Sequence, residues 1–307
     1  MTAVRDLEPA YLALLRSGAL ARVAREAWER LRSCDLCARY CRVNRLDSTR
    51  GAVCRTGARA VVHGFGAHHG EENPLRGTRG SGTIFFSRCN LRCVYCQNWE
   101  ISWKGVGEEV GPEQLAVMML RLQDAGCHNI NFVSPSHVVA QILAGLLVAA
   151  ARGLRLPLVY NTGGYDSLEA LRLLEGVVDI YMPDMKYSDA ATARRYSSPW
   201  DYPDANRAAV REMHRQVGDL VLDEHGVARR GLLVRHLVLP GGLAGTASMA
   251  EFLAREISKD TYVNVMDQYR PCYRADEYPA LARRTTGPEY EEAVEAVRRA
   301  GLWRLDR

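Results

Sequence analysis

Seven of the nine cysteines lie between positions 34 and 96, in two groups whose spacing suits metal chemistry. Cys89, Cys93 and Cys96 are separated by three and two residues, so one loop can wrap three thiolates around a compact cluster. An iron–sulfur cube takes four ligands, and the fourth position would stay open for an exogenous ligand. A zinc loop or a set of buried thiols is the disfavoured alternative, because zinc sites use paired Cys-x2-Cys elements.

The earlier group is larger and forms a closed ligand set. Cys34, Cys37, Cys41 and Cys54 have gaps of two, three and twelve residues. A structural zinc and an auxiliary 4Fe-4S cluster both fit four cysteines, and the three-plus-one grouping favours the cluster. Such a site could relay electrons, anchor a substrate or staple a segment that has little core of its own.

The segments that carry the first group differ from the rest of the chain. Residues 8–32 have apolar positions at three- and four-residue spacing, which predicts a helix that Gly18 divides. Residues 62–82 are rich in glycine without a helical period, so we expect loop with short strands at most. We therefore predict a helical, cysteine-rich N-terminal extension over residues 1–80 and a core domain over residues 81–307.

From about residue 82 the sequence alternates six times between strand and helix patterns. This alternation predicts an α/β fold, either an open parallel sheet or an incomplete (βα)6 barrel, with ligands at the carboxyl ends of the strands. The predicted strands are 82–87, 129–134, 157–161, 177–182, 231–239 and 262–266. The predicted helices are 112–125, 138–152, 168–174, 204–216, 248–257 and 289–299. The loop from Cys89 to Cys96 directly follows the first strand.

Composition narrows the class of protein. With 307 residues, 47% of them hydrophobic, the chain can bury a large core, which excludes a disordered chain and a disulfide-stapled miniprotein. A net charge of +4 disfavours nucleic acid as a partner. The start of the chain lacks an apolar signal segment, and the longest apolar run, 138–151, is too short to span a membrane. We therefore predict a cytoplasmic protein with no membrane partner, whose cysteines are not disulfides.

The motif at Cys89, Cys93 and Cys96, with Tyr95 as the aromatic residue before the third cysteine, resembles that of the radical S-adenosylmethionine (SAM) enzymes. Residues 80–102 look like the branch related to pyruvate formate-lyase activating enzymes. The similarity extends over nearly the whole chain from Cys34 onward. Further similar segments are 131–137, 159–165, 178–187, 233–241 and 264–271.

This resemblance implies a specific chemistry. The three cysteines would hold a 4Fe-4S cluster whose open iron chelates the amino and carboxylate groups of SAM. One electron would cleave the sulfonium, and the 5′-deoxyadenosyl radical would abstract a hydrogen from a substrate, while the protein positions the cofactor and excludes water. The implied partners are SAM, a reduced flavodoxin- or ferredoxin-type electron donor, and a protein, peptide or small-molecule substrate.

Other positions follow from the same resemblance. Ser134, Ser136 and His137 stand where the family grips the methionyl amine of SAM, although His137 could equally be a helix-start residue without a ligand. Asn161 and Thr162 match an Asp-Thr pair that helps to bind a monovalent cation in the activating enzymes, and the asparagine weakens the case for that cation here.

Charged residues at two further strand ends complete the expected cofactor site. Asp184 and Lys186 match an Asp-Leu-Lys element and would hold a cation, the cofactor or substrate, with a loop salt bridge as the alternative. Arg235 matches an arginine that pairs with the cofactor carboxylate. Its neighbour His236 should point to the opposite face of the strand.

The remaining candidates are weaker. We expect Cys127 to be a buried thiol, and Cys272 to be inert in preference to a hydrogen donor or metal ligand. Asp267 and Gln268 are substrate-pocket candidates at the end of the last strand. Possible substrate contacts in the glycine-rich segment are His63, His68, His69, Glu71 and Glu72.

Together these residues predict a radical SAM oxidoreductase, either an activase that installs a glycyl radical on a partner enzyme or an enzyme that modifies a small molecule or peptide directly. Fold-level similarity does not choose the substrate. The competing class is a non-catalytic iron–sulfur electron-transfer or metal-binding protein. A radical enzyme acting on RNA is disfavoured by the near balance of charge.

Overall fold

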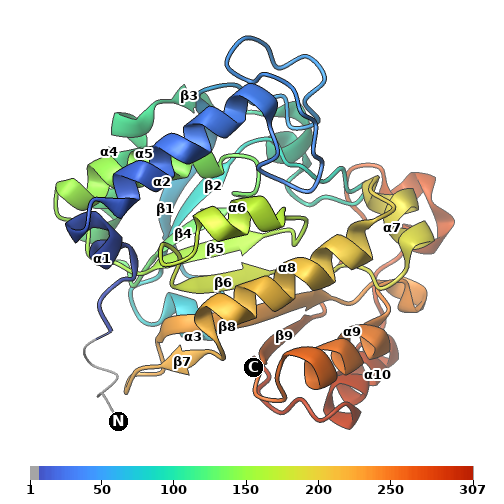
Figure 1. Cartoon of the computed structure of the whole chain (residues 1–307). Coiled ribbons are helices and arrows are strands. Elements are labelled where there is room, and N and C mark those ends of the chain that lie inside the picture. The colour runs from blue at the N-terminus through green and yellow to red at the C-terminus, as the bar shows by residue number, and fades with distance from the viewer. Residues whose placement is uncertain (1–6, 307) are drawn as a thin grey trace.

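The computed structural model describes residues 7–306, and its centre is a mostly parallel sheet (Figure 1). Six parallel strands lie side by side, which confirms the predicted α/β class. In spatial order they are β2 (Ser81–Phe86), β4 (Ile130–Val133), β5 (Leu158–Thr162), β6 (Ile180–Pro183), β8 (Ala228–Leu237) and β9 (Tyr262–Met266). All six were predicted within a few residues, and β6 begins three residues after the start that the sequence predicted.

Antiparallel strands extend the sheet, and one of them corrects a prediction. β1 (Ala60–His68) pairs with β2, and β3 (Glu108–Val110) pairs with β1. The expectation for 62–82, loop with short strands at most, underestimated this segment, because β1 is nine residues long. Gly64 and Gly66 supply no side chains and the outer half of β1 is largely exposed, so the strand has no alternating apolar pattern. The short β7 (Val221–Leu222) pairs with β8.

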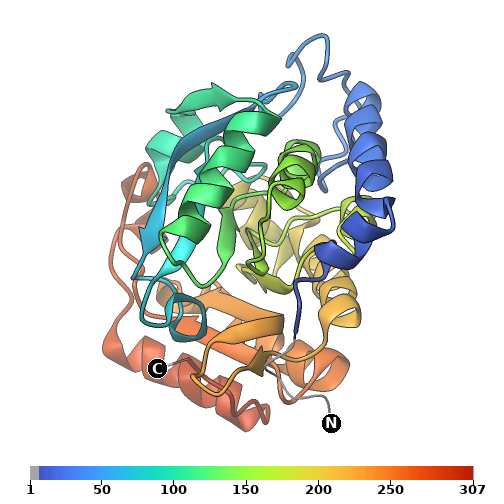
Figure 2. The ribbon, with the colours of Figure 1, turned by 90° about the vertical axis from the view of Figure 1, so that its left-hand side faces the viewer.

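Helices cover the sheet (Figure 2). Gly18, with φ of 73°, ends the first helix and begins the second, as predicted. α7 lies between the predicted strand 177–182 and the predicted helix 204–216, where no element was predicted. The helices are α1 (Tyr11–Arg16), α2 (Ala19–Glu29), α3 (Asn73–Arg76), α4 (Pro112–Asp124), α5 (Val139–Ala151), α6 (Leu168–Leu173), α7 (Ala190–Ser197), α8 (Tyr202–Val217), α9 (Thr246–Phe252) and α10 (Gly287–Arg299). Within residues 7–306 no helix combines the length and apolarity that crossing a membrane requires.

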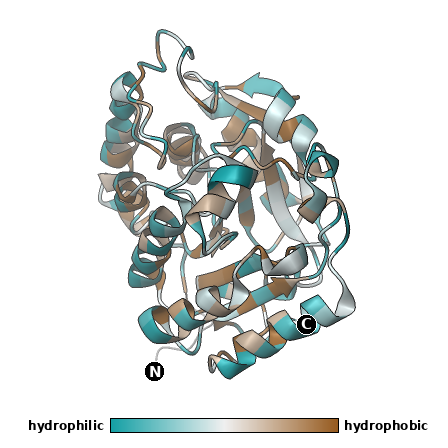
Figure 3. Ribbon diagram, turned by 90° about the vertical axis from the view of Figure 1, so that its right-hand side faces the viewer, coloured by the Kyte–Doolittle hydropathy of each residue, from teal (hydrophilic) through white to brown (hydrophobic). Residues whose placement is uncertain are grey.

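The predicted N-terminal extension shares its packing with the core. α2 packs against α5, the most apolar helix, and β1 continues the central sheet, so the sheet crosses the predicted boundary at residue 80. The division into two domains stays a prediction. Figure 3 shows the strands largely in the brown of apolar residues and the outer helix faces in teal.

The two sides of the sheet, one at β2 and the other at β9, are linked by hydrogen bonds through the segment between β1 and β2. Glu72, in the loop after β1, accepts a hydrogen bond of 3.1 Å from Asn264 of β9. Asn73 contacts Asp306 in the segment that follows α10, and Asp306 also accepts from Tyr262 of β9. These contacts tie the β1–β2 side to the far side of the sheet. Closure into an incomplete barrel stays a prediction.

The side chain of His236 links β8 to the segment after β6 and to the start of α9. Arg235 points toward the strand ends that carry the charged residues, and His236 points away from them, as strand alternation predicts. The His236 ring nitrogens bond the Met185 carbonyl at 2.7 Å and the Thr246 hydroxyl at 2.8 Å. Burial lowers the pKa of His236 to about 4.

We expect this histidine to make the folded state sensitive to acid. The folded-state pKa lies below the usual value of 6.5, so the unfolded chain binds the extra proton and stability falls as pH drops through the interval from 6.5 to 4. Between pH 7.5 and 5.5 the loss from this group is about 1.4 kcal/mol. When the free energy of unfolding is measured in urea, His236→Gln should not show this loss of stability between pH 7.5 and 5.5. Replacing the exposed His225 should leave it in place, and an equal pH dependence of wild type and His236→Gln would contradict the assignment.

Candidate active site

The three-cysteine loop lies at the carboxyl end of β2 and faces a cavity of about 170 Å³. Cys89, Cys93 and Cys96 all line this cavity and are neither fully buried nor fully exposed. The predicted residues that share the wall with them are Ser134, Asn161, Thr162, Asp184, Lys186 and Arg235. Residues from four strand ends and one loop therefore meet in one place, as parallel strand order requires.

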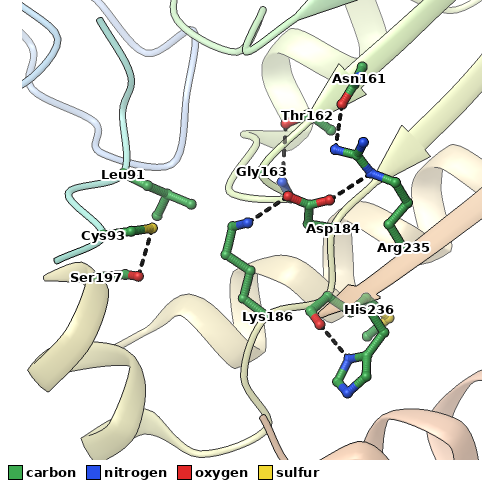
Figure 4. Close-up of polar contacts among 12 residues, drawn as sticks. Leu91, Cys93, Asn161, Thr162, Gly163, Asp184, Lys186, Ser197, Arg235 and His236 are labelled. Atoms are coloured by element: carbon green, nitrogen blue, oxygen red, sulfur yellow. Dashed lines mark hydrogen bonds and ion pairs between the residues drawn. The ribbon is translucent and has the colours of Figure 1, made fainter. Parts of the chain in front are cut away.

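Each of the three sulfurs has one donor directed at it. The Leu91 amide lies 3.4 Å from the Cys89 sulfur, the Ser197 hydroxyl 2.9 Å from the Cys93 sulfur, and the Ser102 hydroxyl 3.1 Å from the Cys96 sulfur. Figure 4 shows the Ser197 contact. Burial raises the pKa of Cys89, and it raises that of Cys93 to about 12. Free thiols here would stay protonated, whereas metal-bound thiolates would be stabilised by these donors, so the set fits an iron–sulfur cluster.

The backbone beside the cysteines is held in an unusual conformation. Seven non-glycine residues among those described have positive φ, and five of them directly adjoin a cysteine. Such conformations cost about 1–3 kcal/mol each and persist where surrounding structure imposes them. Four of the five residues, Tyr40, Arg42, Arg55 and Arg88, adjoin cysteines of the two groups, so the surrounding structure fixes the conformation of both loops. The fifth, Tyr273, follows Cys272.

A compact ion cluster forms the opposite wall of the cavity (Figure 4). Asp184 accepts from Arg235 Nε at 2.9 Å and from Lys186 Nζ at 2.5 Å, while Arg235 Nη2 donates to Asn161 Oδ1 at 2.7 Å. Burial acts to raise the pKa of Asp184, but Arg235 and Lys186 outweigh it and hold this pKa below the usual value. The carboxylate stays ionised, and the two cations it orders can hold an anionic group.

Two further carboxylates, those of Glu71 and Glu72, lie close to the guanidinium of Arg235. Glu71 and Glu72 approach Arg235 Nη1 at 3.6 and 3.7 Å, and Asn131 donates to Glu71 at 2.6 Å. Burial, reinforced by the Glu72 charge, raises the pKa of Glu71 to about 8. Both side chains are buried and absent from the cavity wall, so they hold Arg235, whereas the sequence suggested substrate contacts.

The remaining cofactor candidates are distributed around the wall. Ser136 lies behind it, bonded to the Thr162 hydroxyl at 2.9 Å. His137 bonds the Ser87 carbonyl at 3.1 Å, burial lowers its pKa to about 3, and it does not reach the cavity. Tyr95 is buried and accepts a hydrogen bond from Tyr187, whose hydroxyl also bonds Ser197.

An adjoining cavity of about 220 Å³ shares Cys93, Cys96, Asn98, Asp184, Lys186 and Arg235 with the first. Its other wall consists of Tyr95, Gln97, Leu237, Met266 and Gln268. Gln268 is therefore placed as predicted, whereas Asp267 and Cys272 are not part of either wall. A larger cavity of about 900 Å³ lies between β9 and the C-terminal segment and contains no cysteine. Size alone would have chosen the wrong site.

The four-cysteine group lies next to this site. Cys34, Cys37 and Cys54 are buried and Cys41 is partly exposed. Burial raises the pKa of Cys37, and the other three cysteines of the group raise it further. No three His, Cys, Asp or Glu side chains in the described part of the chain stand in an arrangement ready for a metal ion. The metal content of both groups stays a prediction.

Fold and site together define an α/β protein with a cysteine loop and charged strand ends around a small cavity. The family model of the Radical SAM superfamily matches residues 83–225. The uncharacterized protein MJ0674 of Methanocaldococcus jannaschii is 33% identical over 279 residues, which cover 88% of this chain and 76% of that relative. The chain belongs to the radical SAM superfamily, which implies cleavage of SAM at an iron–sulfur cluster.

One solved structure that the chain matches in part is a radical SAM methyltransferase from Sphaerobacter thermophilus. It superposes with a TM-score of 0.48 at 15% identity, over 72% of this chain and 64% of that chain. This chain thus spans somewhat less than two thirds of that structure.

The hydroxyl beside Cys93 offers a direct test of cluster ligation. Hydrogen bonds to ligand sulfurs stabilise the reduced, more negative cluster, so Ser197→Ala should lower its midpoint potential. A neutral hydrogen bond contributes about 1 kcal/mol, which corresponds to roughly 40 mV for one electron. The measurement is an anaerobic redox titration followed by electron paramagnetic resonance (EPR). Ser188→Ala, which removes a hydroxyl bonded to the Gly245 carbonyl, is the matched control, and an unchanged potential in Ser197→Ala would refute ligation by Cys93.

Proposed function

We propose that this chain is a radical SAM enzyme that abstracts a hydrogen atom from a bound substrate. The observation that carries the proposal is the single cavity in which three donor-stabilised cysteines face Asp184 and Arg235. A carrier that only stores electrons has no use for an ordered pair of cations beside its cluster. The geometry therefore supports an enzyme over the electron-transfer alternative.

Cys89, Cys93 and Cys96 would hold the 4Fe-4S cluster, and the strand-end residues would hold SAM. When bound and reduced, the cluster supplies the electron that splits SAM into methionine and a 5′-deoxyadenosyl radical. Arg235 and Lys186 provide positive charge for the SAM carboxylate. Asp184 fixes both cations, and Asn161 fixes the guanidinium plane of Arg235.

The adjoining cavity supplies a position for the substrate. Gln97, Leu237, Met266 and Gln268 give that part of the wall amide and apolar groups without charge. Such a wall suits an uncharged segment with hydrogen-bonding groups, such as a polypeptide main chain. This surface supports the activating-enzyme reading, in which a glycine of a partner protein loses a hydrogen atom. Direct modification of a small amide is the second candidate.

The test is formation of 5′-deoxyadenosine by the anaerobically reconstituted full chain with SAM and dithionite. Wild type should form the nucleoside, and Cys93→Ala should reduce its yield at least a hundredfold because one cluster ligand is lost. Cys127→Ala removes a buried cysteine that lines neither cavity and should retain the yield. An iron-loaded wild type that forms no nucleoside would exclude the proposed function.

A further inference from the structure

Arg45 is a buried cation without a carboxylate partner in the described structure. Its side chain is among the largest that are fully buried, with 2% of the residue exposed. It donates to the Thr56 carbonyl at 2.6 Å, the Gly57 carbonyl at 3.5 Å and the Cys34 sulfur at 3.4 Å. No Asp or Glu among residues 7–306 forms an ion pair with it.

A buried guanidinium requires a nearby negative charge, because removing an isolated cation from water costs many kcal/mol. The groups that can supply this charge are the cysteines. The Cys34 sulfur is the one of them that Arg45 contacts, at 3.4 Å from Nη1. A metal group that holds these sulfurs as thiolates would place the required negative charge beside the guanidinium.

Arg92 connects this group to the cysteine loop of the active site. It immediately precedes Cys93, donates through Nη2 to the carbonyl of Val53 beside Cys54, and donates through Nη1 to the Ser102 carbonyl at 3.4 Å. One guanidinium therefore bonds backbone carbonyls on both sides, one beside Cys54 and one in the segment after Cys96.

A second arginine, Arg39, also links the two cysteine groups. Arg39, two residues after Cys37, donates to the Asn90 carbonyl at 2.7 Å, and Asn90 follows Cys89. The two cysteine loops thus contact each other through hydrogen bonds without an intervening element of secondary structure. Centres held in these loops would be neighbours, which is the arrangement that fast one-electron exchange needs.

We propose that Cys34, Cys37, Cys41 and Cys54 hold a second, redox-active iron–sulfur centre, and that Arg92 couples its reduction potential to that of the three-cysteine site. Reduction of either centre adds one electron from an external reductant and breaks no bond. The added negative charge is stabilised by Arg92 in both cases. The coupling rests on the function proposed above, whereas the second centre does not.

The first measurement is metal content of the reconstituted full chain. A second cluster gives about eight irons per chain, and Cys37→Ser should leave about four. About four irons with a zinc ion in wild type would overturn the redox-active centre. EPR during stepwise reduction with dithionite should resolve two reduction events in wild type and one in Cys37→Ser.

The second measurement separates coupling from a merely structural role of Arg92. Arg92→Met should lower both midpoint potentials, each by about a tenfold change in the reduction equilibrium, or about 59 mV. Arg92→Lys keeps the charge and should restore most of the shift. The exposed Arg50 lies in the same N-terminal segment, and Arg50→Met should change neither potential because solvent screens its charge.

These outcomes separate the two proposals. Two reduction events without 5′-deoxyadenosine formation would remove the proposed function and keep the second centre. Nucleoside formation with a shift of only one potential in Arg92→Met would keep the enzyme and overturn the coupling. Equal shifts in Arg92→Met and Arg92→Lys would show that the contact geometry matters and the charge does not, which also overturns the coupling.

Discussion

The arrangement of the active site depends on one buried cation, Arg235. Its guanidinium joins Asp184 at the end of β6, Asn161 at the end of β5, and the two glutamates that follow β1. Because the guanidinium is planar and forked, it fixes the direction of each partner as well as its distance. Truncating it would leave Glu71 and Glu72 without a cation, and breaking such a buried pair costs about 3–5 kcal/mol. Strand ends far apart in the chain therefore keep one relative position.

This fixed wall explains why the cysteine loop can be irregular. The loop has no helix or strand to hold it, yet its sulfurs must face the strand ends. It is secured by strained backbone at Arg88, by the Ser197 hydroxyl from α7, and by the Ser102 hydroxyl. The loop is thus anchored at both sides of its cysteines. Its position relative to Arg235 follows from the sheet, since Cys89 lies three residues beyond the end of β2.

Features that depend on short stretches of sequence could be predicted. The cysteine spacing and the strand-end positions of Asp184, Lys186 and Arg235 were sufficient to place them around one cavity, because parallel strands end at one edge. The contacts of Glu72 with Arg235 and of Ser197 with Cys93 span more than a hundred residues, and no spacing rule connects such pairs. β1 was missed for a different reason, since its glycines carry no side-chain pattern.

Comparison of Arg235 with Arg45 gives a physical criterion for the second cysteine group. Arg45 is fully buried, whereas the Arg235 side chain is 18% exposed and lines the cavity, and both charges must be compensated. Arg235 has three carboxylates within 4 Å, whereas Arg45 has a sulfur and two carbonyls. Carbonyl dipoles satisfy its hydrogen bonds but not its charge. Thiolates held by the proposed metal group beside Arg45 would supply the negative charge that these carbonyls do not.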